Sequence, residues 1–386
     1  MIWPIRSLQI SFPDSLPVIE MQALLTGIST AAPSLRILKI SALSGNEEAC
    51  YSLDVLSPLQ QLTHLSFSLP RSTLHMKSMR LEKLDVVAAT MTLGEVCWRH
   101  LHSLTCLLTN SPDLHDLWTS TAQSTVLRTL HLPSLLLNND ILESLRQHPN
   151  LTDLHVKGLE LKLAPPGLDN LTVLQYDEPC NPESLKTALG KAHGVCIKHL
   201  RLCLETCCSR TLRDLMWLVE GSVIILSNCS ALDLQMSHDV ELTADHIEVA
   251  AGVKELFQIL SPLGSYLSAL SVELCHLTLD TGSWISDYFP HLSHIKLVSC
   301  YFESGVLSCL HNLQRLFNVD LCYCDGPGTR KPYLVSFAAY CPNQPLHFHF
   351  VPQLANSEDD EEEGFDDVVA YLHQLQPQAV FTWKWL

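Results

Sequence analysis

The chain has 386 residues, and 47% of them are apolar, which is enough material for an extended core. Its 24 Lys and Arg against 41 Asp and Glu give a formal net charge of −17. This balance argues against nonspecific binding to nucleic acid or to anionic membranes, because both need basic surfaces. No apolar run approaches the roughly 18 residues that a membrane span requires.

The cysteine count and the first residues bear on the compartment. The 15 cysteines are an odd number in a long chain, which does not suggest a disulfide framework. The start of the chain shows no charged segment followed by an apolar one, as a secretory signal would. We therefore expect reduced thiols and a cytoplasmic or nuclear location.

An LxxLxL spacing of apolar residues begins at Ile5, Leu8 and Ile10 and recurs along the chain. The last two apolar residues share one face of a short strand, and one unit cannot bury that face alone, so neighbouring units must stack. The mean interval of about 26 residues lies within the range of leucine-rich repeats. The last apolar position of each predicted unit is Ile10, Ile40, Phe67, Val86, Thr109, Leu132, Val156, Tyr176, Leu202, Leu234, Val272, Leu297 and Leu321.

Several connections between the predicted strands have apolar residues at helical spacing. We expect helices over Asn139–His148, Asn181–Gly194, Arg210–Glu220 and Asp245–Leu260. The short intervals before Val86 and Tyr176 leave room for only a turn or a 3-10 segment. Because helices are wider than strands, they are expected to bend the stack into a horseshoe.

Three successive units end in a cysteine at the same offset, at Cys275, Cys300 and Cys324. The repeat consensus places Asn or Cys at this turn. We expect these thiols to face the interior, beside backbone carbonyl groups.

The segment after Cys324 is predicted to be a C-terminal cap, residues 325–386. Alternating apolar residues predict strands at Leu346–Phe350 and Phe381–Trp385, with a helix over Asp366–Leu375 between them. An acidic loop at 358–367 lies in this cap, and a basic partner is one hypothesis for it.

These repeats resemble the ribonuclease-inhibitor-like leucine-rich superfamily, and the LxxLxLxxC endings are similar to its cysteine-containing subtype, found in F-box leucine-rich proteins. The uneven units, such as LPSLRILKI and FPHLSHIKL, resemble fungal F-box-associated repeat proteins. Repeats and resemblance together predict an α/β fold. The expected architecture is a single leucine-rich-repeat solenoid over residues 1–324 with about 13 strands. A curved parallel sheet is expected on the concave face, and helices, 3-10 segments or turns on the convex face. No F-box is visible ahead of the repeats.

Polar residues between the buried leucines are expected to project from the concave face. Such a mixed-polar surface suits recognition of a folded protein or peptide, and a few positions are expected to dominate the binding energy. The same rows include His64, Lys83, Asp85, Asn318 and Asp320. The candidate partner-binding residues are His131, Asp153, His155, Lys157, Gln175, Asp177, His199, Arg201, Asp233, Gln235, Glu273, His294 and Lys296.

The sequence shows no motif of a nucleophile elbow, phosphate loop or zinc site. We therefore predict no catalytic residues, no metal and no cofactor, and a monomer that binds protein, without nucleic acid or membrane. The main hypothesis is substrate recognition in a ubiquitin ligase, as the resemblance implies. The alternatives are a structural or inhibitory binder and a GTPase-activating regulator.

Overall fold

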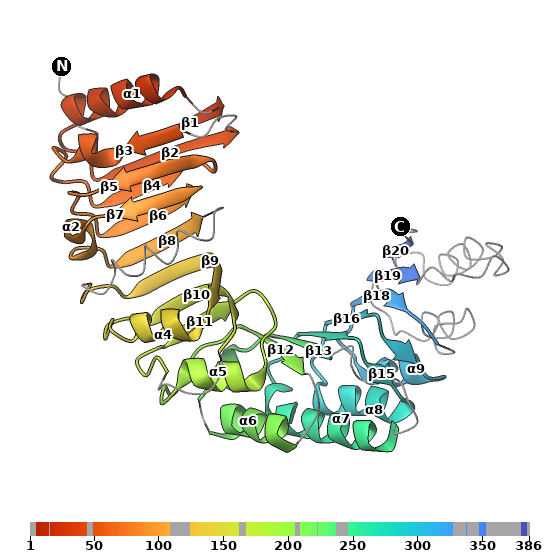
Figure 1. Ribbon diagram of the computed structural model, residues 1–386. Helices are drawn as coiled ribbons and strands as arrows, with labels where there is room; N and C mark the ends of the chain where they lie inside the picture. Colours follow the sequence, from red (N-terminus) through yellow and green to blue (C-terminus); the bar gives the residue numbers. More distant parts are fainter. Residues whose placement is uncertain are drawn as a thin grey trace. The chain divides into compact units, whose positions relative to one another are not determined.

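The computed structural model describes most of the chain, in two compact units. Unit 1 comprises Met1–Glu178 and Ser184–His193, and unit 2 comprises Pro179–Glu183 and Gly194–Leu386. Both appear in Figure 1. The described residues are 5–14, 16–44, 49–108, 124–161, 167–204, 209–221, 223–236, 246–326, 337, 347–352 and 380–383.

Unit 1 is built on one parallel sheet whose strands follow each other in chain order. Each strand repeats the register of the one before it, so Leu38, Leu65 and Leu84 align in one row of side chains, all of them buried. The strands are β1 (Ser7–Asp14), β2 (Ile37–Ser44), β4 (His64–Ser68), β6 (Lys83–Ala88), β8 (Ser103–Leu108), β9 (Thr129–Leu137), β10 (Asp153–Leu159) and β11 (Val173–Tyr176).

Unit 2 has a second parallel sheet with the same repeating register. Leu232, Leu270 and Ile295 form a buried row across three of its strands. The strands are β12 (His199–Leu204), β13 (Ala231–Met236), β14 (Ala269–Glu273), β16 (His294–Val298), β18 (Asn318–Cys324), β19 (His347–Pro352) and β20 (Val380–Trp383).

The leucine-rich-repeat fold is confirmed, but its strands form two sheets where the sequence predicted one continuous sheet. The next strand in the chain, β12, does not pair with β11. Its neighbour at that edge is Cys180, which forms a parallel bridge with Leu202. The Cys180 N–H donates to the Arg201 carbonyl at 3.3 Å, and the Cys203 N–H donates to the Cys180 carbonyl at 2.8 Å. These bonds occupy the edge of β12 that a neighbouring strand would need.

The fifth predicted repeat was placed in the wrong register. The sequence placed Leu107 and Thr109 at its end, whereas β8 aligns Leu104 with Leu84 and Cys106 with Val86. Leu104 and Cys106 are both fully buried, and Leu107 is 38% exposed. A cysteine takes the place of the last leucine here because its thiol behaves as a small hydrophobic group. Thr109 lies outside the described residues.

The outer layer of unit 1 contains extended segments as well as helices (Figure 1). The short connection before Val86, expected to be only a turn or 3-10 segment, forms a strand of a second, three-stranded parallel sheet. That sheet consists of β3 (Ala49–Ser52), β5 (Ser72–Met76) and β7 (Thr90–Leu93). The other outer elements are α1 (Val18–Ala31), η1 (Leu53–Leu56), α2 (Glu95–Trp98), α4 (Asn139–Leu145) and most of α5 (Pro182–Leu189).

The longer intervals of unit 2 accommodate longer helices. Among these, α6 packs on α7, and α7 packs on α8. Phe257 of α7 and Phe289 after α8 meet with ring centroids 5.8 Å apart. The helices are α6 (Ser209–Glu220), α7 (His246–Leu260), α8 (Leu279–Tyr288) and α9 (Val306–Cys309). Shorter elements are η3 (Leu226–Asn228), η4 (Ser261–Leu263), β15 (His276–Leu277), β17 (Tyr301–Phe302) and η5 (Leu310–Asn312).

The four helices expected between the repeat strands are all present, with boundaries shifted by a few residues. Asn138 caps α4, because its side-chain oxygen accepts the Ile141 N–H at 3.0 Å. The helix expected over Asp366–Leu375 lies outside the described residues. Among the described helices, none combines the length and the apolar character that crossing a membrane would need.

The three cysteine-ended turns of unit 2 are built as expected. Cys275, Cys300 and Cys324 are buried, and the Cys300 thiol donates to the carbonyl of Val272 at 3.4 Å. The Cys324 thiol likewise lies 3.3 Å from the Leu297 carbonyl oxygen. The residue before each cysteine has a positive φ, 60° at Leu274, 50° at Ser299 and 56° at Tyr323.

The segment after Cys324 continues the parallel array in its described part. Phe348 and Phe350 of β19 align with Val319 and Leu321 of β18, and Phe381 of β20 aligns with Phe348. Both strands expected in this segment are therefore present. The assignment of residues 325–386 as a cap, with its acidic loop, stays a prediction.

Candidate binding surface

The candidate surface is the strand face, which we define as the side of each sheet opposite the buried leucine rows. Side chains alternate along a strand, so the residues between buried positions share this face. In β10, for example, Leu154 and Val156 are fully buried, while Asp153, His155 and Lys157 are partly exposed. The thirteen predicted residues lie on the strand faces or directly after a strand, six in unit 1 and seven in unit 2.

On unit 1, histidine–aspartate pairs bridge successive repeats. His131 Nε2 lies 3.4 Å from Asp153 Oδ1, and His155 Nε2 lies 3.1 Å from Asp177 Oδ2. The two imidazole rings meet edge to face, with centroids 5.8 Å apart. Gln175 is the register partner of His155 on β11. The structure thus brings together five of the six predicted residues as a ladder of adjacent polar groups.

The sixth residue of unit 1, Lys157, pairs with a residue that the sequence analysis missed. Its Nζ lies 2.9 Å from Glu178 Oε1. Glu178 follows β11, one residue beyond Asp177, where the alternation that guided the prediction no longer applies. On an earlier part of the same face, Lys83 Nζ lies 3.4 Å from Asp85 Oδ2. The lysines of both pairs are therefore neutralised within unit 1.

On unit 2, two predicted residues share the carboxylate of a third. Asp233 Oδ2 lies 2.8 Å from His199 Nε2 and 3.3 Å from Arg201 Nε. Arg201 Nη2 also lies 3.0 Å from His199 Nδ1. All three side chains are between one fifth and two fifths exposed, so solvent screens their charges and the cluster adds modestly to stability.

The other predicted residues of unit 2 are less constrained by neighbours. Gln235 and Glu273 are register partners on β13 and β14. His294 Nδ1 lies 2.8 Å from Ser293 Oγ, and its ring contacts Phe317, with centroids 4.5 Å apart. Lys296 is exposed and forms no ion pair with any described residue. Phe317 was missed because the prediction considered only polar positions.

A ladder of hydroxyl groups runs along the edge where the strands begin. Thr172 Oγ1 donates to the Thr152 carbonyl at 3.0 Å, and Ser293 Oγ donates to the Ser268 carbonyl at 2.9 Å. Ser268 Oγ in turn donates to the Ser230 carbonyl at 3.0 Å. Each hydroxyl binds the carbonyl at the same position of the preceding repeat, so Ser and Thr recur here for a structural reason.

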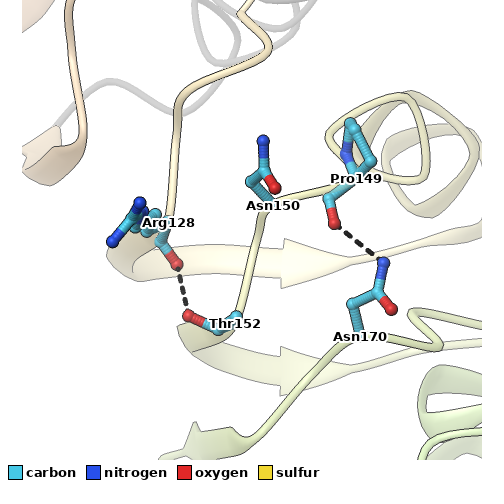
Figure 2. A pocket seen from close by; sticks show the side chains of 5 residues that line it. All are labelled: Arg128, Pro149, Asn150, Thr152 and Asn170. Atoms are coloured by element: carbon cyan, nitrogen blue, oxygen red, sulfur yellow. Dashed lines mark hydrogen bonds between the residues drawn. The ribbon is translucent and has the colours of Figure 1, made fainter.

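An open pocket of about 480 Å³ lies at this edge of β9, β10 and β11. Figure 2 shows Asn170 donating to the Pro149 carbonyl, at 2.7 Å, and Thr152 bonded to the Arg128 carbonyl, at 3.4 Å. The amide nitrogen of Asn170 and the hydroxyl of Thr152 are thus already used within the repeats. Arg128 extends away from the two asparagines in the same view. The pocket follows from the shape of the repeat edge.

The chemistry of the strand faces is that of ion pairs and hydrogen bonds. Burial raises the pKa of Cys106 to about 12 and the pKa of Cys229 to about 11, so neither thiol is a nucleophile near neutral pH. Within the described part of the chain, no three His, Cys, Asp or Glu side chains are placed to hold a metal ion.

No model of a known protein family and no curated protein matches the chain. The solved structures that match the chain include the complex of TLR13 with ssRNA13, at 16% identity and a TM-score of 0.41. The match covers 84% of this chain but only 46% of that one. An internalin from Listeria monocytogenes has 12% identity and a TM-score of 0.35, over 90% of this chain and 81% of the internalin. A protein from Bacteroides fragilis has 13% identity and a TM-score of 0.30, over 59% and 66%.

Proposed function

We propose that the chain is a non-catalytic scaffold that binds a folded protein or peptide through its strand faces. The observation that carries this proposal is the ordered presentation of polar side chains at strand spacing. His131, His155 and Gln175 stand in register on unit 1, and Arg201, Asp233 and Ser271 do so on unit 2. Rows of this kind offer many polar contacts on a rigid support, which lowers the entropy lost on binding.

The finer proposal is that the bound protein is a substrate in a ubiquitin-ligase context. It is supported by the cysteine-ended turns at Cys275, Cys300 and Cys324, which resemble those of F-box-associated repeats. Co-purification of a cullin adaptor with the tagged chain tests this context separately. A structural or inhibitory binder is the outcome if partners are found without that adaptor. Accelerated GTP hydrolysis would point instead to the GTPase-activating alternative.

The test of the scaffold proposal compares partner recovery between matched variants of the tagged chain. One variant carries His155→Ala with Lys157→Ala on unit 1, and another carries His199→Ala with Arg201→Ala on unit 2. The control carries Glu143→Ala with Arg146→Ala, which removes an ion pair on α4 in the outer layer. All three variants remove exposed or half-exposed groups, so all are expected to fold.

Quantitative mass spectrometry of crosslinked partners gives the readout. We expect at least one strand-face variant to lose a partner by roughly tenfold while the α4 control keeps it, because a few contacts carry most of the binding energy. Partners that survive both strand-face variants and disappear with the α4 control would place recognition on the outer layer and contradict the proposal.

A further inference from the structure

Lys296, in the middle of β16, is a cation that the surrounding face leaves unneutralised. Its register partners are Ser271 on β14 and Asp320 on β18. Asp320 Oδ1 instead lies 3.7 Å from His349 Nδ1, and no ion pair joins Lys296 to a described residue. Elsewhere on the strand faces, Lys83, Lys157 and Arg201 lie near carboxylates of this chain, whereas Lys39 of β2, like Lys296, forms no ion pair with a described residue. Lys296 therefore has its charge available for a carboxylate from outside.

An exposed aromatic platform adjoins this cation. His294 lies two residues before Lys296 on the same face, and its ring meets Phe317 at an interplanar angle of 73°. Phe317, directly before β18, is 37% exposed, although it is a large apolar side chain. Partly exposed aromatic residues beside charged ones are typical of the positions that dominate protein interfaces.

The strand beside this platform carries small side chains. Ala269 is the register partner of His294, and Ser271 is the register partner of Lys296. On the next strand, Ala231 pairs with Ala269 in turn. These three side chains extend less far from the sheet than histidine or lysine does, so at the level of His294 a partner's side chain meets only alanine on β13 and β14. At the level of Lys296, β13 carries Asp233, which His199 and Arg201 hold.

We infer that unit 2 binds a protein segment in which an acidic residue stands next to an aromatic or aliphatic one. The carboxylate pairs with Lys296, and the apolar side chain packs over Ala269 against the His294–Phe317 platform. Charge complementarity of this kind sets orientation and selects partners. The inference rests on the proposed function, because it names the chemistry of the partner at the same strand face.

A displayed library of random peptides, panned against the purified full-length chain, supplies the probe. We expect the enriched peptides to contain Asp or Glu beside an aromatic or aliphatic residue. Binding of such a peptide to Lys296→Glu is expected to be weaker by roughly tenfold or more, and weaker also to Phe317→Ala. Asp320→Asn removes the carboxylate nearest in register to Lys296, and we expect it to tighten binding severalfold.

Lys39→Glu is the matched control. Lys39 occupies the same position of its repeat on β2, is exposed, and forms no ion pair with another described residue. Lys39 has Gln9 and Ser66 as register partners and is no part of the His294–Phe317 platform, so the Lys39→Glu chain is expected to bind the peptides as the unsubstituted chain does. Unchanged circular dichroism of each variant excludes loss of folding as the cause.

The outcomes separate this inference from the proposed function. Enriched peptides without acidic residues, or no enriched peptide at all, would overturn the inference. So would equal binding to the Lys296→Glu and unsubstituted chains. If these peptides are displaced by strand-face substitutions elsewhere, the scaffold proposal stands without the inference. Peptides unaffected by any strand-face substitution would contradict both.

Discussion

The two units share one repeat but differ in what surrounds the unpaired lysine on the strand face of each. On unit 1, His131, His155, Lys83 and Lys157 each lie close to a carboxylate of the same unit. On unit 2, the Asp233 cluster is similarly closed. Among the described residues, neither Lys39 on unit 1 nor Lys296 on unit 2 forms an ion pair, but of these two it is Lys296 that lies beside a partly exposed aromatic pair, His294 and Phe317. Side chains that already satisfy each other give up existing contacts when a partner binds. An unpaired charge loses only its hydration, and an adjacent aromatic pair adds apolar contact, so the surroundings of Lys296 favour unit 2 as the site of selective contact.

The outer layers differ as well, and interval length explains the difference. Only 19 residues separate Phe67 from Val86 in unit 1, and the connection is the extended segment β5. In unit 2, 38 residues separate Leu234 from Val272, and α7 lies between them. An extended connection spans the same distance with fewer residues than a helix, because the rise per residue is more than twice as large.

The largest expected effect comes from shortening one buried leucine in each unit. Leu154 is 0% exposed and Leu270 is 1% exposed. Leu154→Ala and Leu270→Ala should each lower the free energy of unfolding by about 2–5 kcal/mol, because each leaves a cavity. Hydrogen exchange should show protection lost mainly in the strands beside each substitution, since a repeat contacts only its neighbours.

Gln175→Ala on the strand face is the control, and it should change stability by at most about 0.5 kcal/mol. Protection lost equally throughout both units in the leucine variants would show that they unfold as a single body. That result would remove the basis for treating the two units separately.

Replacing one glycine in each unit by alanine is expected to change the free energy of unfolding in opposite directions. A Cβ at Gly264, in unit 2, would lie 1.8 Å from the Tyr288 carbonyl oxygen, and Gly264→Ala should destabilise the chain by about 1–3 kcal/mol. A Cβ at Gly27, in helix α1 of unit 1, would meet no atom within 4 Å. Gly27→Ala should therefore stabilise by about 0.4–1 kcal/mol. Urea denaturation measures both changes in the free energy of unfolding, and two changes in the same direction would contradict the prediction.

A smaller effect is expected at alkaline pH from one buried thiol in each unit. Burial raises the pKa of Cys106 to about 12 and the pKa of Cys229 to about 11, from an ordinary value of 9.0. Above pH 9 the unfolded chain loses these protons while the folded chain keeps them, so stability falls as pH rises. Each thiol contributes at most about 1.4 kcal/mol per pH unit, up to its folded pKa.

Urea denaturation between pH 7.5 and 10.5 checks this dependence. Cys106→Ala and Cys229→Ala should each flatten the loss of stability above pH 9. Cys50→Ala replaces an exposed thiol of unit 1 and should leave the slope unchanged. A slope that is the same in all three variants would show that other groups cause the alkaline loss.

Much of the strand pattern was predictable because each leucine-rich repeat has the same spacing of buried residues. The periodicity correctly predicted the register of twelve of the thirteen repeats. It failed at β8, where Cys106 replaces a larger apolar residue. The break between β11 and β12 was not predictable, because it depends on hydrogen bonds that Cys180 makes with Arg201 and Cys203. Helix α1 was also missed, since its buried Met21, Leu25 and Ile28 are set among apolar residues on several sides.

The positions of the candidate residues followed from alternation alone, but their pairing did not. Alternation placed Lys157 and Lys296 on the same kind of face, and it gave no sign that only Lys157 has a carboxylate neighbour. That contrast depends on which residues follow the next strand, as Glu178 does after β11. Phe317 was likewise beyond a prediction that searched for polar residues only.

The left-handed turns at Leu274 and Ser299 carry a consequence for how such a chain changes length. Both precede a buried cysteine and have a similar positive φ, although their side chains differ. Excising one whole segment from the first turn to the next would bring together two surfaces of matching shape, because each stretch touches only its neighbours. Losing a single residue would instead turn the buried side chains of the following strand outward. Duplication and loss of entire segments is thus the route of variation that this architecture permits.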